Sequence, residues 1–214
     1  MTELTELVLV RHASSTRREI GKWGRRYDAP LAAGFEEQLE HSRRYIEGIQ
    51  DFVLMSSPLQ RCLQTAQYIA PDCPIAIIDD FTAYHSGAME ELRESEISVK
   101  HPGYLEQSYS ERFLSPRFGE ESLVEQARRV ARGLASALRV ASDANARSIV
   151  IVGHYSSINS IAHMATNSWD VRTYGLGAFD LEDGELLRLS IDSSFLGSRL
   201  TDFNGRGAAT CDGA

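Results

Sequence analysis

The chain has 214 residues, of which 43% are hydrophobic and 24% charged, so it suits one α/β domain with a buried core and is not a disordered chain. Its formal net charge of −8 disfavours a nucleic-acid-binding protein, which usually carries a basic excess. No stretch approaches the roughly 20 apolar residues of a membrane span, and the acidic N-terminus argues against a secretory signal. Three cysteines without zinc-ligand spacing indicate free thiols. We therefore expect a cytoplasmic protein with no nucleic-acid partner, no membrane partner and no metal.

Short apolar runs alternate along the chain with amphipathic segments. The runs, which we predict to be buried strands, are residues 7–10, 52–55, 75–78 and 148–152. The predicted helices are residues 34–49, 58–70, 120–141 and a stretch that follows His154 and ends near Ala165. We expect Ser57 to be the N-cap of the second helix, with Pro58 in its first turn. Strands that alternate with helices predict a largely parallel sheet with helices on both faces.

Two other segments are irregular. Residues 14–31 form a long basic loop that also contains aromatic side chains, and loops of that length are more often functional than not. Residues 79–119 carry only short helical pieces, and we expect them to form an insertion or cap over a site.

The sequence of the last quarter of the chain indicates a β-hairpin followed by a tail. Residues 174–180 and 185–191 are typical of strands, and Asp183-Gly184 between them is a turn signal. From residue 193 onward Gly, Ser, Asp and Asn dominate, so we expect 193–214 to be a mobile tail after a single catalytic domain at 1–192.

Basic side chains follow three of the predicted strands. Arg11 and His12 end the first strand, His154 follows the fourth, and Arg61 stands in the first turn after the second. Because the carboxyl ends of parallel strands share one sheet edge, these four side chains should meet there. A lone His or Arg at a strand end is usually structural, but this combination is far more specific.

The chemistry of two arginines and two histidines suits phosphoryl transfer. Two guanidinium groups and helix N-terminal amides can hold a tetrahedral dianion. One neutral imidazole can attack phosphorus and form a phosphohistidine, while the other donates to the phosphate oxygens. The positive charge comes from side chains, so this chemistry needs no metal and no cofactor.

At these residues the chain resembles the histidine phosphatase superfamily, also called the phosphoglycerate mutase-like family. The resemblance rests, in family order over roughly residues 6–190, on segments 7–12, 28–34, 56–66, 119–130 and 149–154. It implies a three-layer α/β/α sandwich around a mixed, mostly parallel sheet. It also implies that His12 is the nucleophile, His154 the second catalytic histidine, and Arg11 with Arg61 the phosphate clamp.

The chain departs from the family pattern beside this site. Ala13 and Ser14 stand where the family has Gly and a polar or acidic residue, Arg18 lies near its usual Asn, and Tyr155-Ser156 replaces Gly-Gly. We expect the following residues to contact the substrate: Ser14, Ser15, Arg18, Tyr155 and Glu90.

The general acid is the largest departure. The family usually carries Glu four residues before a Gly that corresponds to Gly87, and Ala83 occupies that position here. Either Glu90, Glu91 or His85 replaces the acid, or no strong acid is needed, or the alignment is offset by a few residues. Without an acid, aryl phosphates, acyl phosphates, anhydrides and phosphohistidine are better substrates than alkyl phosphates, because their leaving groups need no proton.

The basic residues of the 14–31 loop allow two interpretations. Arg17, Arg18, Lys22, Arg25 and Arg26 either recruit a second anionic group of the substrate or form an ordinary solvated loop.

The leading hypothesis is a metal-independent phosphatase that works through a phosphohistidine on His12. The alternatives are a phosphoglycerate mutase-type phosphoryl transfer and a degenerate phosphate-binding or regulatory protein. The expected partner is a small phosphorylated substrate, a phosphoprotein is possible, and the sequence leaves the oligomeric state open, a dimer included.

Overall fold

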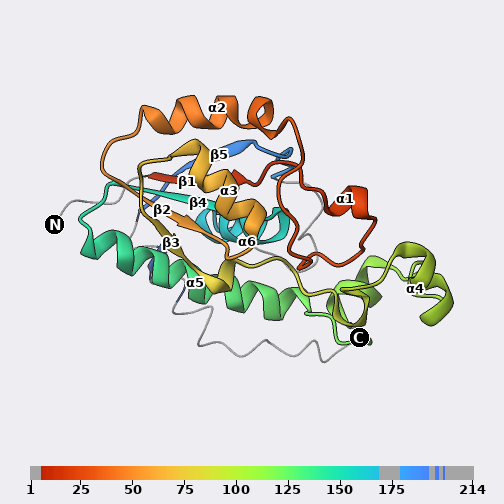
Figure 1. Cartoon of the computed structure of the whole chain (residues 1–214). Helices are drawn as coiled ribbons and strands as arrows, with labels where there is room; N and C mark the ends of the chain where they lie inside the picture. Colours follow the sequence, from red (N-terminus) through yellow and green to blue (C-terminus); the bar gives the residue numbers. More distant parts are fainter. Residues whose placement is uncertain (1–5, 169–178, 193–195, 198–199, 201–214) are drawn as a thin grey trace.

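The computed structural model describes residues 6–168, 179–192, 196–197 and 200, and five strands within them form one sheet (Figure 1). The strand order is β3-β2-β4-β1-β5. The β1, β2, β3 and β4 strands pair in parallel, whereas β5 runs antiparallel to β1. The strands are β1 (Glu6–Arg11), β2 (Phe52–Ser56), β3 (Ile75–Ile77), β4 (Ser148–Gly153) and β5 (Leu186–Ser190). The predicted mixed, mostly parallel sheet is confirmed.

Helices cover both faces of this sheet, as predicted for a three-layer sandwich. Helices α2 and α3 pack on one face, and α5 and α6 pack on the other (Figure 1). The α-helices are α1 (Arg17–Ile20), α2 (Phe35–Glu47), α3 (Gln60–Ile69), α4 (Glu94–Lys100), α5 (Leu123–Asp143) and α6 (Tyr155–Ala165). None of the helices in the described part of the chain combines the length and apolar character that a bilayer crossing requires.

The alternation of side chains along each strand explains the two core layers. In β1, Leu7 and Leu9 join the core under α5 and α6, whereas Val8 and Val10 join the core under α2 and α3. All residues of β4 are buried, because helices cover both faces of this central strand. Helices therefore cover both faces of the sheet where β1 and β4 pair.

Residues 79–119 contain short helical pieces, as the sequence indicates. These are the 3₁₀ turns η1 (Asp79–Phe81) and η2 (Gly87–Met89), the helix α4, and one π-helical turn, η3 (Ser110–Leu114). Met89, Ile97 and Tyr104 form a separate small core, against which Trp23 of the 14–31 loop packs. Figure 1 shows α4 beyond the sheet, on the same side of the molecule as α1.

Some predicted boundaries are wrong. Helix α3 begins at Gln60, with Leu59 as N-cap, because the Ser57 hydroxyl contacts His154 and so stays at the sheet edge. Helix α5 begins at Leu123 and not at residue 120, because Ser122 and Glu125 form a capping box there.

The predicted hairpin is only partly within the described residues. Its second strand is confirmed as β5. Residues 174–178 of its first strand lie outside the described residues, Phe179 and Asp180 are not in a strand, and nearly all of the predicted tail also lies outside.

Candidate active site

Two histidines meet at the carboxyl edge of the sheet, as predicted. His12 follows β1 and His154 follows β4, and these strands are paired in parallel so that Arg11 lies opposite Gly153. The His12 backbone N–H donates to the Gly153 carbonyl (3.0 Å). The two imidazole centroids are 5.1 Å apart, and the rings are inclined at 67°. One anion can therefore contact both rings.

The Arg61 guanidinium lies between these two rings. Its Nε donates to Nε2 of His12 (3.1 Å), and its Nη2 donates to Nδ1 of His154 (3.2 Å). The other bonds go to the backbone carbonyls of Tyr27 (2.9 Å) and Arg25 (2.7 Å). Arg61 is only 2% exposed, and no carboxylate in the described ranges lies within ion-pair distance of it. A buried cation with neutral partners is suited to bind an anion.

The protonation state of His12 follows from its two contacts. Because an arginine can only donate, Nε2 of His12 must be an acceptor, and Nδ1–H donates to the Ala13 carbonyl (2.7 Å). Burial and the Arg61 charge lower the pKa of His12 from its ordinary value to about 3. The ring is therefore neutral near pH 7, with its Nε2 lone pair directed into the site, which is the nucleophilic form.

His154 is also neutral, with the opposite tautomer. Its Nδ1 accepts from Arg61, so its Nε2–H faces the Ser57 hydroxyl (2.8 Å). Burial and Arg61 hold the pKa of His154 well below its ordinary value. Cys62 Sγ lies 3.5 Å from Nε2 of His154, and burial raises the pKa of this thiol to about 12, so it is a neutral packing neighbour.

Arg11 is held by a carboxylate that the sequence analysis did not associate with the site. Its Nη2 lies 2.6 Å from Oδ1 of Asp183, and its Nη1 donates to the Leu181 carbonyl. The guanidinium also stacks on the Tyr155 ring, 5.2 Å from the centroid. Asp183 belongs to the predicted turn before β5, and the sequence there signals only a turn.

A cavity of about 260 Å³ opens between these side chains. Ser15 and Tyr155, which we expect to contact the substrate, line it, and so do Arg17 and Arg25 of the basic loop. Among the described residues the lining comprises Arg11, His12, Ser15, Arg17, Arg25, Arg61, Ala83, His154, Tyr155, Ser156 and Asp183. The described residues hold no group of His, Cys, Asp or Glu side chains arranged to bind a metal ion.

Other predicted contacts are not in this lining. Glu90 requires a correction, because its carboxylate accepts from the backbone N–H groups of Arg26 (3.0 Å) and Ser86 and so ties the loop to the cap segment. Ser14 is turned away, because its hydroxyl donates to Oδ2 of Asp183 (2.8 Å). The Arg18 side chain lies outside the described residues.

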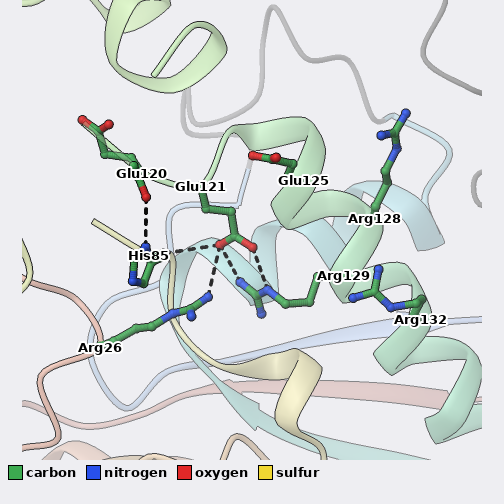
Figure 2. A pocket seen from close by; sticks show the side chains of 9 residues that line it. Arg26, His85, Glu120, Glu121, Glu125, Arg128, Arg129 and Arg132 are labelled. Carbon is green, nitrogen blue, oxygen red and sulfur yellow. Dashed lines mark hydrogen bonds and ion pairs between the residues drawn. The ribbon is translucent and has the colours of Figure 1, made fainter. Parts of the chain in front are cut away.

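Ala83, which the sequence aligns with the family's usual acid position, lies in the wall of the cavity. It is 2% exposed, and its carbonyl accepts from Arg26 Nε (2.9 Å) and Arg129 Nη2 (3.4 Å). Figure 2 shows Arg26 and Arg129 on either side of Glu121, which binds both. These ion pairs fix the backbone that presents Ala83 to the cavity.

The three groups considered as replacements for the acid lie elsewhere. Glu90 is bound to backbone N–H groups, as described above, and Glu91 is exposed and pairs with Lys22 at 3.5 Å. His85 lines a separate hollow of about 460 Å³ together with Arg26, Glu121 and Arg129, and its Nδ1 contacts the Gly119 carbonyl there (Figure 2). None of the three is among the residues that line the cavity at His12.

Solved structures share this fold at low sequence identity. A mycobacterial glucosyl-3-phosphoglycerate phosphatase is 20% identical, with a TM-score of 0.70 over 87% of this chain and 90% of that chain. The alpha-ribazole phosphatase of Shigella flexneri is 19% identical, with a TM-score of 0.71 over 86% and 89%. A phosphoserine phosphatase of Entamoeba histolytica, solved with 3-phosphoglyceric acid, is 24% identical, with a TM-score of 0.65 over 86% and 89%.

No functionally curated protein sequence matches the chain. Residues 7–194, however, match the family model of the histidine phosphatase superfamily (branch 1). The matched range contains β4, nearly all of β1 and both histidines. Family membership and the phosphatase neighbours support a phosphatase hydrolase. The chain thus belongs to branch 1 of the histidine phosphatase superfamily, as its sequence motifs predict.

Proposed function

We propose that this protein is a metal-independent phosphatase that hydrolyses a small phosphate ester through a phosphohistidine on His12. The observation that carries the proposal is the neutral imidazole of His12, whose Nε2 lone pair faces the buried cation of Arg61 at 3.1 Å. No carboxylate of the described residues pairs with that cation. A nucleophile beside such a cation suits attack on a bound phosphoryl group.

The first step transfers the phosphoryl group to the enzyme. Arg61 and Arg11 bind the phosphate oxygens, and Nε2 of His12 attacks phosphorus in line with the leaving group. The N–P bond forms as the ester P–O bond breaks, and the electron pair of that bond leaves on the substrate oxygen. Once Arg61 Nη2 has moved from Nδ1 of His154 to the phosphate, the bound dianion favours transfer of a solvent proton to this nitrogen. The Nδ1–H then donates to a phosphate oxygen, because Ser57 already engages Nε2.

The second step is hydrolysis of the phosphohistidine. A water oxygen attacks phosphorus, the P–N bond breaks, its electron pair returns to Nε2 of His12, and the water proton is lost to solvent. Inorganic phosphate then leaves, and the Arg61 contact with His12 re-forms.

Ala83 directs the substrate preference. Its methyl group occupies a wall of the cavity and cannot protonate a leaving group. The preferred substrates are therefore aryl phosphates, acyl phosphates or other anhydrides, and phosphohistidine. The same absence disfavours a mutase, which has to protonate a poor leaving group and retain it. The cavity of about 260 Å³ suits a small molecule or a single modified side chain.

The decisive experiment compares wild type with His12→Ala in the presence of EDTA, with p-nitrophenyl phosphate as substrate. Wild type should turn over and yield an acid-labile phosphoenzyme when quenched with labelled substrate, whereas His12→Ala should do neither. His41→Ala, which removes an exposed histidine of α2, is the matched control and should behave like wild type. Near-normal turnover by His12→Ala, or recovery only on addition of Mg²⁺ or Zn²⁺, contradicts the proposal. Conversion of 3-phosphoglycerate to 2-phosphoglycerate indicates a mutase instead.

A further inference from the structure

The predicted turn at Asp183-Gly184 is built into the active site. The Gly184 N–H donates to the Arg11 carbonyl (3.1 Å), and the Arg11 N–H donates to the Glu185 carbonyl (2.9 Å). The Ser42 hydroxyl of α2 donates to the Gly184 carbonyl (2.6 Å). These bonds fix the turn directly beside the last residue of β1.

Gly184 is required for this placement. Its φ is 87°, and a Cβ atom there would lie 2.6 Å from the Gln38 carbonyl oxygen. The turn is thus pressed against α2, and the preceding side chain, Asp183, is directed to Arg11 and not to solvent.

The carboxylate of Asp183 contacts two side chains that bear on the site, those of Arg11 and Ser14. Oδ1 lies 2.6 Å from Arg11 Nη2, and Oδ2 accepts from the Ser14 hydroxyl (2.8 Å). Both charged side chains are largely buried, with 17% of Arg11 and 13% of Asp183 exposed. Charge-assisted bonds in such surroundings hold a guanidinium in one orientation.

One donor of the Arg11 guanidinium, the Nε–H, is buried without a hydrogen-bond partner among the described residues. The Leu181 carbonyl accepts from Nη1, and the Asp183 carboxylate forms an ion pair with Nη2. A buried unsatisfied donor is costly unless a ligand satisfies it. Because Arg11 lines the cavity together with His12 and Arg61, a phosphate oxygen bound there is suited to accept this N–H.

We propose that Asp183 is a positioning residue, which together with Leu181 turns Arg11 so that its Nε–H points to the phosphate oxygens. Ser14 serves this pair by fixing the carboxylate and does not itself bind phosphate. This inference rests on the proposed function, because it assumes that the cavity binds a phosphoryl group.

A double-mutant cycle tests whether Asp183 acts through Arg11. The variants are Asp183→Ala, Arg11→Ala and the double variant, with kcat/KM for p-nitrophenyl phosphate and the dissociation constant of vanadate measured for each. Asp183→Ala should lower kcat/KM and weaken vanadate binding about tenfold or more in the wild-type background, but less than about twofold in the Arg11→Ala background. Asp183→Asn, which keeps an acceptor for Nη2, should fall between wild type and Asp183→Ala.

A general loss of folding would give a different pattern. In that case Asp183→Ala would lower kcat/KM by the same factor in the wild-type and the Arg11→Ala backgrounds. Independent effects of this kind overturn the inference. Glu182→Gln, an exposed charge change in the same turn, should equal wild type, and the melting temperatures of all variants show whether each is folded. Selective loss of alkyl phosphate turnover in Asp183→Asn, with the aryl ester spared, would make Asp183 a proton donor and also overturn it.

The vanadate arm separates this inference from the proposed function. If no variant and no wild type hydrolyses any phosphate ester but the vanadate cycle shows the coupling, the proposed function fails and the role of Asp183 stands. If wild type hydrolyses phosphate esters and the effects of Asp183→Ala and Arg11→Ala are independent, the proposed function stands and the role of Asp183 fails.

Discussion

Nε of Arg61 donates to Nε2 of His12 across 3.1 Å, so the cation that should hold the phosphate occupies the lone pair that should attack it. In the empty site this contact satisfies two buried groups at once. An arriving phosphate has to draw the guanidinium onto its own oxygens before His12 is free to react. Binding of the anion and release of the nucleophile are thus one event.

Arg61→Lys tests the need for the planar guanidinium. A lysine keeps the charge but cannot contact both imidazoles and the carbonyls of Tyr27 and Arg25 together. We expect kcat/KM for p-nitrophenyl phosphate to fall at least about a hundredfold, the cost of one lost oxyanion donor. Arg43→Lys on the exposed face of α2 is the control and should match wild type. Retention of activity within about threefold would show that charge alone suffices at this site.

The lowered histidine pKa values predict how the protonation of the site and the stability of the fold depend on pH. Burial and Arg61 lower the pKa of His12 to about 3 and that of His154 well below its ordinary value, so neither imidazole should titrate between pH 5 and 8. Between the folded and unfolded pKa values the unfolded chain binds more protons, so stability should be complete above about pH 6.5 and should fall as the pH is lowered toward 3.

Histidine NMR measures this directly. The ring resonances of His12 and His154, assigned from His12→Ala and His154→Ala spectra, should stay constant over that range in the unliganded protein. The resonance of the exposed His41, which lies outside the site, is identified by its absence from the His41→Ala spectrum. A midpoint near 6.5 for His12 or His154 is incompatible with the buried, arginine-paired arrangement.

Ala83→Glu should alter substrate preference. Because Ala83 lines the cavity and its carbonyl is held by Arg26 and Arg129, a carboxyl group at this position would reach the leaving-group side of the site. We expect alkyl phosphate turnover to rise relative to p-nitrophenyl phosphate turnover. The increase should be smaller than the hundredfold or so of an evolved general acid, because no surrounding groups orient the new side chain.

Glu90→Gln and Glu91→Gln are the matched controls for Ala83→Glu. Neither carboxylate lines the cavity, so neither variant should change the ratio of alkyl to aryl turnover. If Glu90→Gln or Glu91→Gln abolishes alkyl phosphate turnover alone, the acid is displaced and not missing.

Glu121→Gln should destabilise the fold and disturb the backbone that carries Ala83, because Arg26 and Arg129 bind both Glu121 and the Ala83 carbonyl. Glu121 is 11% exposed and accepts two bonds from Arg129, at 2.7 and 2.8 Å, while Arg26 lies 3.5 Å away. Removing its charge leaves two arginines without their counter-ion, and we expect a loss of about 3 kcal/mol in the free energy of unfolding. Glu47→Gln, which breaks an exposed pair with Arg43 on α2, should cost less than about 0.5 kcal/mol. Urea denaturation of both variants measures the difference, and equal losses refute it.

The sequence alone was sufficient for the five strands of the sheet, for helices on both of its faces and for the meeting of His12, His154 and Arg61 at one edge. The strands are short apolar runs, and parallel pairing of β1 with β4 brings His12 and His154 together at one edge. Arg61 is predictable for the same reason, since it stands in the first turn of α3, the helix that follows β2. Each of these inferences depends on local pattern and on a general rule of α/β topology.

Only the tertiary structure decided what surrounds these residues. Asp-Gly is typical of a turn wherever it occurs, and the position of Asp183 beside Arg11 depends on the antiparallel pairing of β5 with β1. Glu90 carries a carboxylate that could bind a ligand, but this group accepts from the backbone N–H of Arg26 in a distant loop and from that of the nearby Ser86. Contacts between segments so far apart in the chain depend on how the elements pack, and no local pattern of residue types encodes them.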